Sequence, residues 1–180
     1  MNRARTRRYV AALTAAVPLL TVLGIASAPA AQAAQGNFVI CSGTSTVTYN
    51  PGITLTPRPV HASGVDLYAP CTSSDPTLMS GANSFDGTLT LSCLEPLASG
   101  PGTTVVNWNN GRHSTLFVNG AVTTIGGQII DVFTGTVIEG EFEDATVTAQ
   151  ITEAQPNVIQ CATTGVTSAS GSATLQIITP

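Results

Sequence analysis

An all-β fold is predicted for this chain of 180 residues, as an antiparallel two-sheet sandwich of the immunoglobulin-like type, with a closed β-barrel as the alternative. Three observations lead to this prediction. From Ala34 onward, 47 of 147 residues are Thr, Val or Ile, which pack well on a pleated surface. Several segments alternate between apolar and hydroxyl side chains. No long stretch has the 3.6-residue apolar spacing of an amphipathic helix, so helices should be nearly absent.

The alternation is clearest over residues 88–93, where Leu89, Leu91 and Cys93 share one face and hydroxyl side chains share the other. Residues 145–151 repeat the pattern, and two further segments, 114–119 and 172–179, are similar. One apolar face and one hydroxyl-rich face are typical of an antiparallel sheet with a single buried side.

Gly and Pro separate these segments. Asn110-Gly111 lies between two strand-like flanks and predicts a hairpin with a type I′ turn. Asn50-Pro51-Gly52 predicts another turn, and Asn119-Gly120, Gly126-Gly127 and Gly140 predict breaks. About nine strands are expected in one domain. Their ranges are 37–49, 53–57, 60–69, 85–93, 103–109, 113–125, 128–139, 143–152 and 171–179.

Four cysteines, Cys41, Cys71, Cys93 and Cys161, predict two disulfides. A zinc site is disfavoured because there is no C-x-x-C pair and no His close to a Cys in sequence. A turn at Pro51 and a loop over 72–83 would place Cys41 and Cys93 at the same end of the sheet. This register favours Cys41–Cys93 with Cys71–Cys161, and the two other connectivities stay open.

The N-terminal segment predicts export. Arginines between Arg3 and Arg8 precede an apolar run, and Ala31-Gln32-Ala33 offers a cleavage site, so residues 1–33 are predicted to be a signal peptide. The exported domain would then span residues 34–180 and be extracellular, not anchored in the membrane. General secretion is favoured over the twin-arginine route, which Thr6-Arg7-Arg8 also resembles.

Charge excludes one class of partner. After position 33 the chain has no Lys, and two arginines, Arg58 and Arg112, stand against ten carboxylates. Such a surface repels phosphate backbones and anionic lipids, so binding to nucleic acid or to a membrane surface is not expected.

Catalytic patterns are missing from the sequence. There is no G-x-S-x-G and no H-E-x-x-H, and the two imidazoles, His61 and His113, have no motif around them. The protein is therefore predicted not to be an enzyme, with no cofactor and no metal.

The one acidic cluster is Glu139, Glu141 and Glu143 with Asp144. At a period of two, the three glutamates would share one face of a strand. A solvated edge that discourages aggregation is the preferred interpretation. A Ca²⁺ site and a glycosidase pair are the alternatives.

The predicted 110–111 hairpin is the candidate surface for a partner. Trp108, Asn110, Arg112 and His113 would project from a rigid two-stranded base, and Trp and Arg often dominate binding energy at interfaces. Trp108 could also stack on carbohydrate together with Tyr49 and Tyr68. Against carbohydrate stacking, the preferred interpretation is that this single Trp belongs to the core, as a lone Trp in a β-sandwich more often does.

The chain as a whole resembles small secreted β-sandwich proteins of actinomycetes, of the Streptomyces type. The resemblance rests on the Arg-rich signal, the lysine-free domain and five short segments. These are Cys41-Ser-Gly-Thr, Gly87-Thr-Leu-Thr-Leu-Ser-Cys93, Trp108-Asn-Asn-Gly-Arg, Gly135-Thr-Val and Gly165-Val-Thr-Ser-Ala-Ser-Gly. It implies location and fold, and no catalytic residue.

The expected function is that of a secreted, non-enzymatic binding module acting on a protein or a cell-wall carbohydrate partner. A secreted enzyme inhibitor, or an enzyme of unrecognised type, is the alternative.

Overall fold

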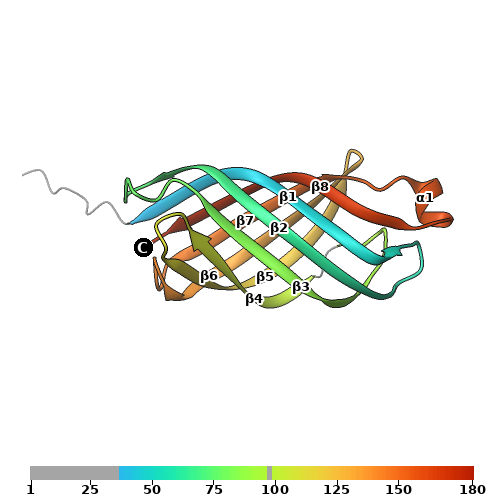
Figure 1. Cartoon of the computed structure of the whole chain (residues 1–180), viewed down its shortest axis with the longest axis horizontal. Helices are drawn as coiled ribbons and strands as arrows, with labels where there is room; N and C mark the ends of the chain where they lie inside the picture. Colours follow the sequence, from blue (N-terminus) through green and yellow to red (C-terminus); the bar gives the residue numbers. More distant parts are fainter. Residues whose placement is uncertain (1–36, 97–98) are drawn as a thin grey trace, which may run out of the picture. The chain divides into compact units, whose positions relative to one another are not determined.

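The computed structural model describes residues 37–96 and 99–180, which form eight antiparallel strands and one short helix (Figure 1). The strands close into a barrel in sequence order, each pairing with the next and β8 with β1. The predicted signal peptide lies outside the described residues. The elements are β1 (Phe38–Ile53), β2 (Arg58–Ser73), β3 (Gly81–Leu91), β4 (Gly100–Trp108), β5 (His113–Ile125), β6 (Gln128–Gly140), β7 (Thr146–Ala154), α1 (Val158–Ala162) and β8 (Val166–Ile178).

The all-β prediction is confirmed, but the immunoglobulin-like sandwich is wrong and the barrel alternative is right. The deciding feature is β1, which pairs with β2 on one side and with β8 on the other along most of its length. In a sandwich the strands would form two separate sheets, each with free edge strands, and β1 and β8 would not have to pair. Pairing the first strand with the last removes both edges of the sheet.

Two predicted breaks are wrong. The strand β1 continues through Asn50-Pro51-Gly52 to Ile53, and the chain turns over residues 54–57 instead of forming a strand at 53–57. The strand β5 continues through Asn119-Gly120, because both residues pair with β6. The scarcity of helix is confirmed, since α1 has five residues. No helix within 37–96 and 99–180 has the length and apolarity needed to cross a bilayer.

The predicted 110–111 hairpin is present between β4 and β5, with a different turn. The backbone N–H of Gly111 donates to the Trp108 carbonyl, and that of Trp108 donates to the Arg112 carbonyl. Among the residues of this loop, only Gly111 has a positive φ, of 82°. This is a three-residue loop with a left-handed glycine at its end. Gly126 and Gly127 both have positive φ, of 59° and 77°, as a two-residue type I′ turn requires.

Apolar side chains fill the barrel as two clusters. The first contains Trp108 and Leu175, and the second contains Tyr49 and Ile53. Buried polar side chains also face the interior. We call five of them the polar belt: Ser45, Asp66, Asn83, Asp131 and Glu153.

Both predicted disulfides are present, but the favoured pairing is wrong. The bonds are Cys41–Cys71 and Cys93–Cys161. Because the β1–β2 turn lies at 54–57, Cys41 and Cys71 are direct neighbours across the two strands. Cys93 follows β3, beside the 54–57 turn, and meets Cys161 of α1 there. Two disulfides suggest an oxidising, extracellular environment.

Candidate functional site

Trp108, the predicted aromatic contact of the hairpin, is buried. Its side chain is 4% exposed, and its indole N–H donates to the Ser114 hydroxyl at 2.9 Å. Its ring lies edge-on to Phe142, with centroids 6.3 Å apart. Tyr49 and Tyr68 are buried as well. The prediction of an exposed aromatic surface is therefore wrong, and the core alternative for Trp108 is right.

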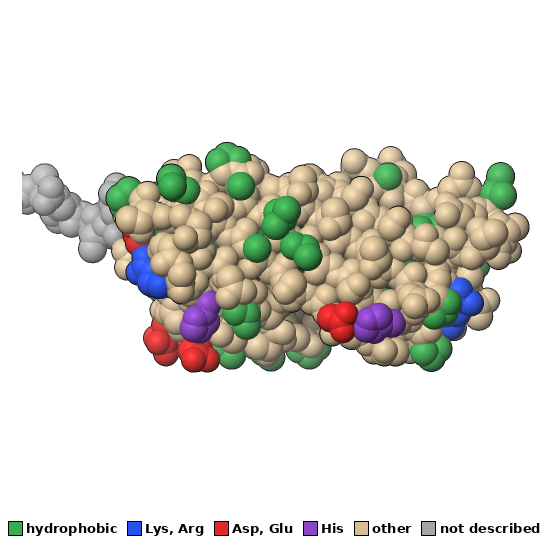
Figure 2. Space-filling view, viewed as in Figure 1, with side chains coloured by type: hydrophobic (Ala, Val, Ile, Leu, Met, Phe, Trp, Pro, Cys, Tyr) green, Lys and Arg blue, Asp and Glu red, His purple; other side chains and the backbone are tan. Residues whose placement is uncertain are grey.

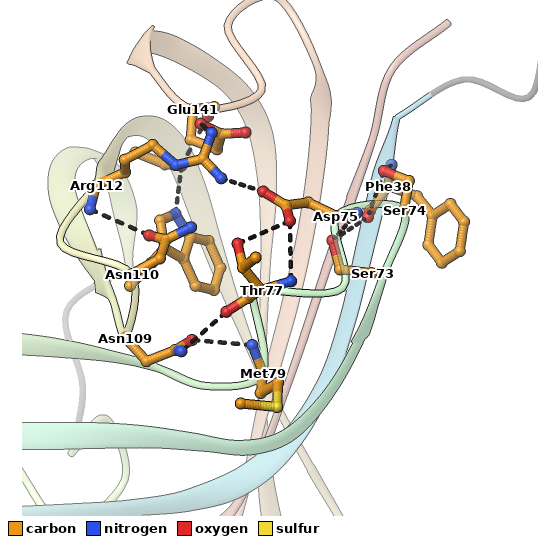
Figure 3. Close-up of polar contacts among 12 residues, drawn as sticks. Phe38, Ser73, Ser74, Asp75, Thr77, Met79, Asn109, Asn110, Arg112 and Glu141 are labelled. Atoms are coloured by element: carbon orange, nitrogen blue, oxygen red, sulfur yellow. Dashed lines mark hydrogen bonds and ion pairs between the residues drawn. The ribbon is translucent and has the colours of Figure 1, made fainter.

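The exposed side chain of Arg112 binds other parts of the same protein. Its guanidinium forms ion pairs with Asp75 and with Glu141, the second at 2.6 Å (Figure 3). The Asn110 side-chain oxygen accepts a hydrogen bond from the Arg112 backbone N–H at 3.1 Å. Two hydrogen bonds with Thr77 lower the pKa of Asp75. The Arg112 guanidinium lowers it further, to a smaller degree. His113 is exposed. The hairpin tip is thus attached to the loop before β3 and to the β6–β7 turn.

The predicted glutamate face at 139–143 does not exist. The strand β6 ends at Gly140, and Phe142 and Asp144 have positive φ of 63° and 67°. Glu141 and Glu143 therefore lie in a turn, where Glu141 pairs with Arg112. No group of three or more His, Cys, Asp or Glu within the described ranges has an arrangement that could hold a metal ion.

A cavity of about 320 Å³ opens where β3 and β4 separate. These two strands pair only over Gly81–Asn83 and Val106–Trp108. Beyond Asn83, β3 continues along β2 while β4 continues along β5, and the cavity lies between the two unpaired stretches. It is lined by Asp66, Tyr68, Asn83, Phe85, Leu89, Ser99, Gly100, Pro101, Gly102, Thr103, Thr104, Leu116, Val118, Phe133, Ala149 and Ile151.

The walls of this cavity are mainly aliphatic and aromatic, contributed by strands from both sides of the opening. The outer surface differs. On the face shown in Figure 2, charged side chains are few and hydrophobic ones are scattered in small groups. The described basic residues are Arg58, His61, Arg112 and His113, and none of them lines the cavity. The one carboxylate that does is Asp66.

Three carboxyl groups of the polar belt are buried without adequate partners. Asp66 is 4% exposed, Asp131 1% and Glu153 3%. Neither carboxylate oxygen of Asp131 has a hydrogen-bond partner, and neither does one oxygen each of Asp66 and Glu153. The Tyr49 hydroxyl, also buried, has none. Unpaired buried carboxylates are rare because their desolvation is costly.

Strand register explains why Asp66 and Glu153 approach each other. Asp66 lies opposite Ser45 on β1, Ser45 lies opposite Gly171 on β8, and Gly171 lies opposite Glu153 on β7. Gly171 has no side chain, and a Cβ added there would lie 2.8 Å from Glu153 Cγ. The space beside Gly171 is therefore occupied by the Glu153 side chain. Asp131 lies on the neighbouring strand, β6.

Burial is the main cause of the shifted acidities in the polar belt. It raises the pKa of Asp131 to about 7, with a further contribution from the Glu153 charge. It also raises the pKa of Glu153, where the Asp66 charge adds to the effect. The pKa of Asp66 is raised by burial, against a smaller lowering by the Ser45 hydroxyl. Burial followed by the charges of Glu153 and Asp131 raises the pKa of Tyr49.

One amide orients the carboxyl at the cavity wall. The Thr104 hydroxyl donates to Asn83 Oδ1 at 3.0 Å, which leaves the Asn83 NH₂ group facing Asp66 Oδ2 at 3.5 Å. Asp66 Oδ1 stays without a partner. The cavity therefore combines apolar walls with one acidic group that has unused hydrogen-bonding capacity.

The belt carboxylates were not among the predicted site residues, although their positions carried a signal. Each lies on the apolar face of its strand: Asp66 two residues before Tyr68, Asp131 two after Ile129, and Glu153 two after Ile151. Extending the alternation at 145–151 by one step places Glu153 inside. A carboxylate in phase with buried apolar residues indicates either a paired charge or a functional group.

His61, one of the two imidazoles without a catalytic motif around them, lies on the outer surface. Its Nε2 is 3.1 Å from Asp86, and both side chains are exposed.

Comparisons with family models, with curated proteins and with solved structures gave no match to this chain.

Proposed function

We propose that this protein is an extracellular binding protein, without catalytic activity, that holds a small and largely apolar molecule inside its barrel. The observation that carries the proposal is the cavity between the unpaired parts of β3 and β4. Its volume, about 320 Å³, falls at the lower end of the range for ligand pockets, roughly 300–1,000 Å³.

The architecture supports this reading. A barrel of eight strands is just wide enough either to be filled by side chains or to hold one small ligand. Here the two apolar clusters fill part of the interior, and the cavity remains beside the polar belt. Apolar walls with a few well-placed polar groups are typical of sites for small organic molecules.

The proposal differs in location from the predicted contact surface on the β4–β5 hairpin. The tip residue best suited to an interface, Trp108, is buried, and the Arg112 guanidinium binds Asp75 and Glu141. The cavity, in contrast, is an open space that no side chain of the described residues fills.

The test is a pair of tryptophan substitutions on β4. Gly102 lines the cavity, and a Cβ added there meets no atom within 4 Å, so Gly102→Trp should fill the cavity without moving the backbone. Val105→Trp is the control, since Val105 points outward from the same strand.

The probe is 2-naphthylmethanol, a neutral apolar molecule, added to the protein with both disulfides formed. Equilibrium dialysis should show that the wild type binds the probe. Binding should be weaker by about tenfold or more in Gly102→Trp, a loss of about 1.4 kcal/mol, because the new side chain occupies the cavity. Binding should be unchanged in Val105→Trp. Thermal unfolding checks that each variant is folded, and Gly102→Leu replaces the Trp variant if it is not. Equal binding by all proteins, or no binding by the wild type at millimolar probe, would contradict the proposal.

A further inference from the structure

We infer that the ligand of this cavity carries a protonated nitrogen, an ammonium or amidinium group, which binds Asp66 while its apolar part fills the space between β3 and β4. This inference rests on the proposed function and specifies the chemical class of the ligand.

The first argument is the state of Asp66. Its side chain lines the cavity, is 4% exposed, and has one oxygen without any hydrogen-bond partner. The other oxygen receives a long contact of 3.5 Å from Asn83, and the Ser45 hydroxyl on the facing strand gives the carboxylate some further stabilisation. A buried carboxylate is stable only when it is paired and hydrogen-bonded. A cationic N–H donor in the cavity would supply both.

The second argument is the surrounding charge. Glu153 and Asp131 lie on the adjoining strands β7 and β6, and Glu153 is close enough to Asp66 for the two charges to interact. The titratable hydroxyls around them belong to Tyr49 and Tyr68. No arginine or histidine of the described chain lines the cavity. Every charge that these groups can carry is therefore negative, so ionisation of the belt would attract a cation and repel a carboxylate or phosphate ligand.

The third argument is orientation. Because Thr104 donates to Asn83 Oδ1, the amide presents its NH₂ group to Asp66 Oδ2, while Asp66 Oδ1 has no hydrogen-bond partner. Phe85 and Phe133 line the same cavity. Aromatic rings of this kind also favour a cation close to their faces.

Binding should depend on pH, because an ammonium ligand pairs with the ionised carboxylate of Asp66 and not with the neutral acid. Burial raises the pKa of Asp66, against a smaller lowering by the Ser45 hydroxyl, so the ionised form is reached at a higher pH than in an exposed carboxyl. Affinity should therefore increase with pH until the ligand amine itself begins to deprotonate.

The experiment uses three probes with one skeleton: 2-naphthylmethylamine, 2-naphthylmethanol and 2-naphthoic acid, at pH 7. Wild-type protein should bind the amine at least about tenfold more tightly than the alcohol, and the acid most weakly. Repeating the measurement from pH 4 to pH 8 should show that the affinity for the amine increases with pH and that the affinity for the alcohol does not.

The variant is Asp66→Asn, which keeps the shape of the side chain and removes the charge. It should lose the preference for the amine, with affinity for the alcohol kept within about threefold, and the increase of amine affinity with pH should disappear. Asp86→Asn is the matched control, because Asp86 is an exposed carboxylate on β3 that pairs with His61. It should behave as the wild type does.

The outcomes separate the two proposals. If the alcohol binds as tightly as the amine, or if Asp66→Asn keeps the preference, the cationic ligand is wrong and the apolar site remains. If the acid binds best, the inferred sign of the potential is wrong. If none of the three binds at millimolar concentration, the site itself is wrong and both proposals fail.

Discussion

Asp131 is the residue whose environment departs furthest from that of an exposed carboxyl. It is 1% exposed, neither of its oxygens has a hydrogen-bond partner, and burial with the Glu153 charge raises its pKa to about 7. In the unfolded chain the same carboxyl titrates near pH 4. Between these two values the folded protein holds a proton that the unfolded chain has released.

The stability of the protein should therefore decrease as pH rises from about 4 to about 7, by up to about 4 kcal/mol from this residue. The contribution is fully present below the unfolded pKa and is lost as pH passes the folded pKa. Asp131→Asn should flatten this dependence, because its amide does not titrate. Urea unfolding at pH 5 and pH 8 measures the effect.

Asp144→Asn is the control for that measurement, since Asp144 is exposed in the β6–β7 turn. It should keep the pH dependence of the wild type. A wild-type protein as stable at pH 8 as at pH 5 would mean that Asp131 is ionised in the fold at little cost, through water or a rearranged partner.

At the scale of one element, β8 depends on Gly171 in its middle. A Cβ at this position would lie 2.2 Å from the Thr152 carbonyl oxygen of β7 and 2.8 Å from Glu153 Cγ. The first of these is a backbone atom, which cannot move without displacing the strand. The glycine thus allows β7 and β8 to approach and leaves room for the Glu153 side chain.

Gly171→Ala should destabilise the protein by about 2 kcal/mol or more, since overpacking a filled site typically costs about 1–3 kcal/mol. Gly87→Ala is the matched control on β3, because a Cβ there meets nothing within 4 Å. That variant should be neutral, or more stable by about 0.5–1 kcal/mol. Urea unfolding of both variants compares them, and equal stabilities would show that β7 and β8 can separate freely.

At the scale of the whole molecule, the two disulfides lie in different apolar clusters. Cys41 belongs to the cluster that contains Trp108, whereas Cys93 and Cys161 belong to the cluster that contains Tyr49. The bond Cys41–Cys71 joins neighbouring strands across 30 residues of sequence. The bond Cys93–Cys161 connects the end of β3 to α1 across 68 residues.

Replacing either pair by alanine should lower the free energy of unfolding by about 2–5 kcal/mol, and more for Cys93–Cys161 because that bond closes the longer loop of the unfolded chain. Denaturant unfolding of the two double variants measures the difference. Peptide mapping without reduction should recover Cys41–Cys71 and Cys93–Cys161. Recovery of the Cys41–Cys93 peptide would show that the β1–β2 register differs from the one described.

Much of the local structure was predictable, because strand alternation depends on neighbours in sequence. The hairpin around Gly111, the turn at Gly126-Gly127 and the end of β6 at Gly140 all follow from glycine conformation, and each is present. The continuation of β1 through Pro51 was not predictable in the same way. Its residues satisfy turn chemistry, yet pairing with β2 and β8 extends the strand past them.

The candidate site was less predictable than the fold. The sequence directed attention to the hairpin tip, where Trp108 lies beside a turn. The three-dimensional fold instead buries that ring against Ser114 and Phe142. Asp66, Asp131 and Glu153 are far apart in sequence. The alternation of each strand indicates that the carboxylate faces the interior, but it does not show that the three lie close together.

What the sequence alone determined is therefore the β class, the two disulfides and the face of each strand, because a period of two follows from backbone geometry. What only the tertiary structure decided is closure of the sheet, the cysteine pairing and the convergence of the buried carboxylates. A sandwich and a barrel share the same alternation, so the pattern cannot distinguish them. The pairing of β1 with β8 joins the two ends of the domain, and that long-range contact brings Asp66 and Glu153 to one site beside the cavity.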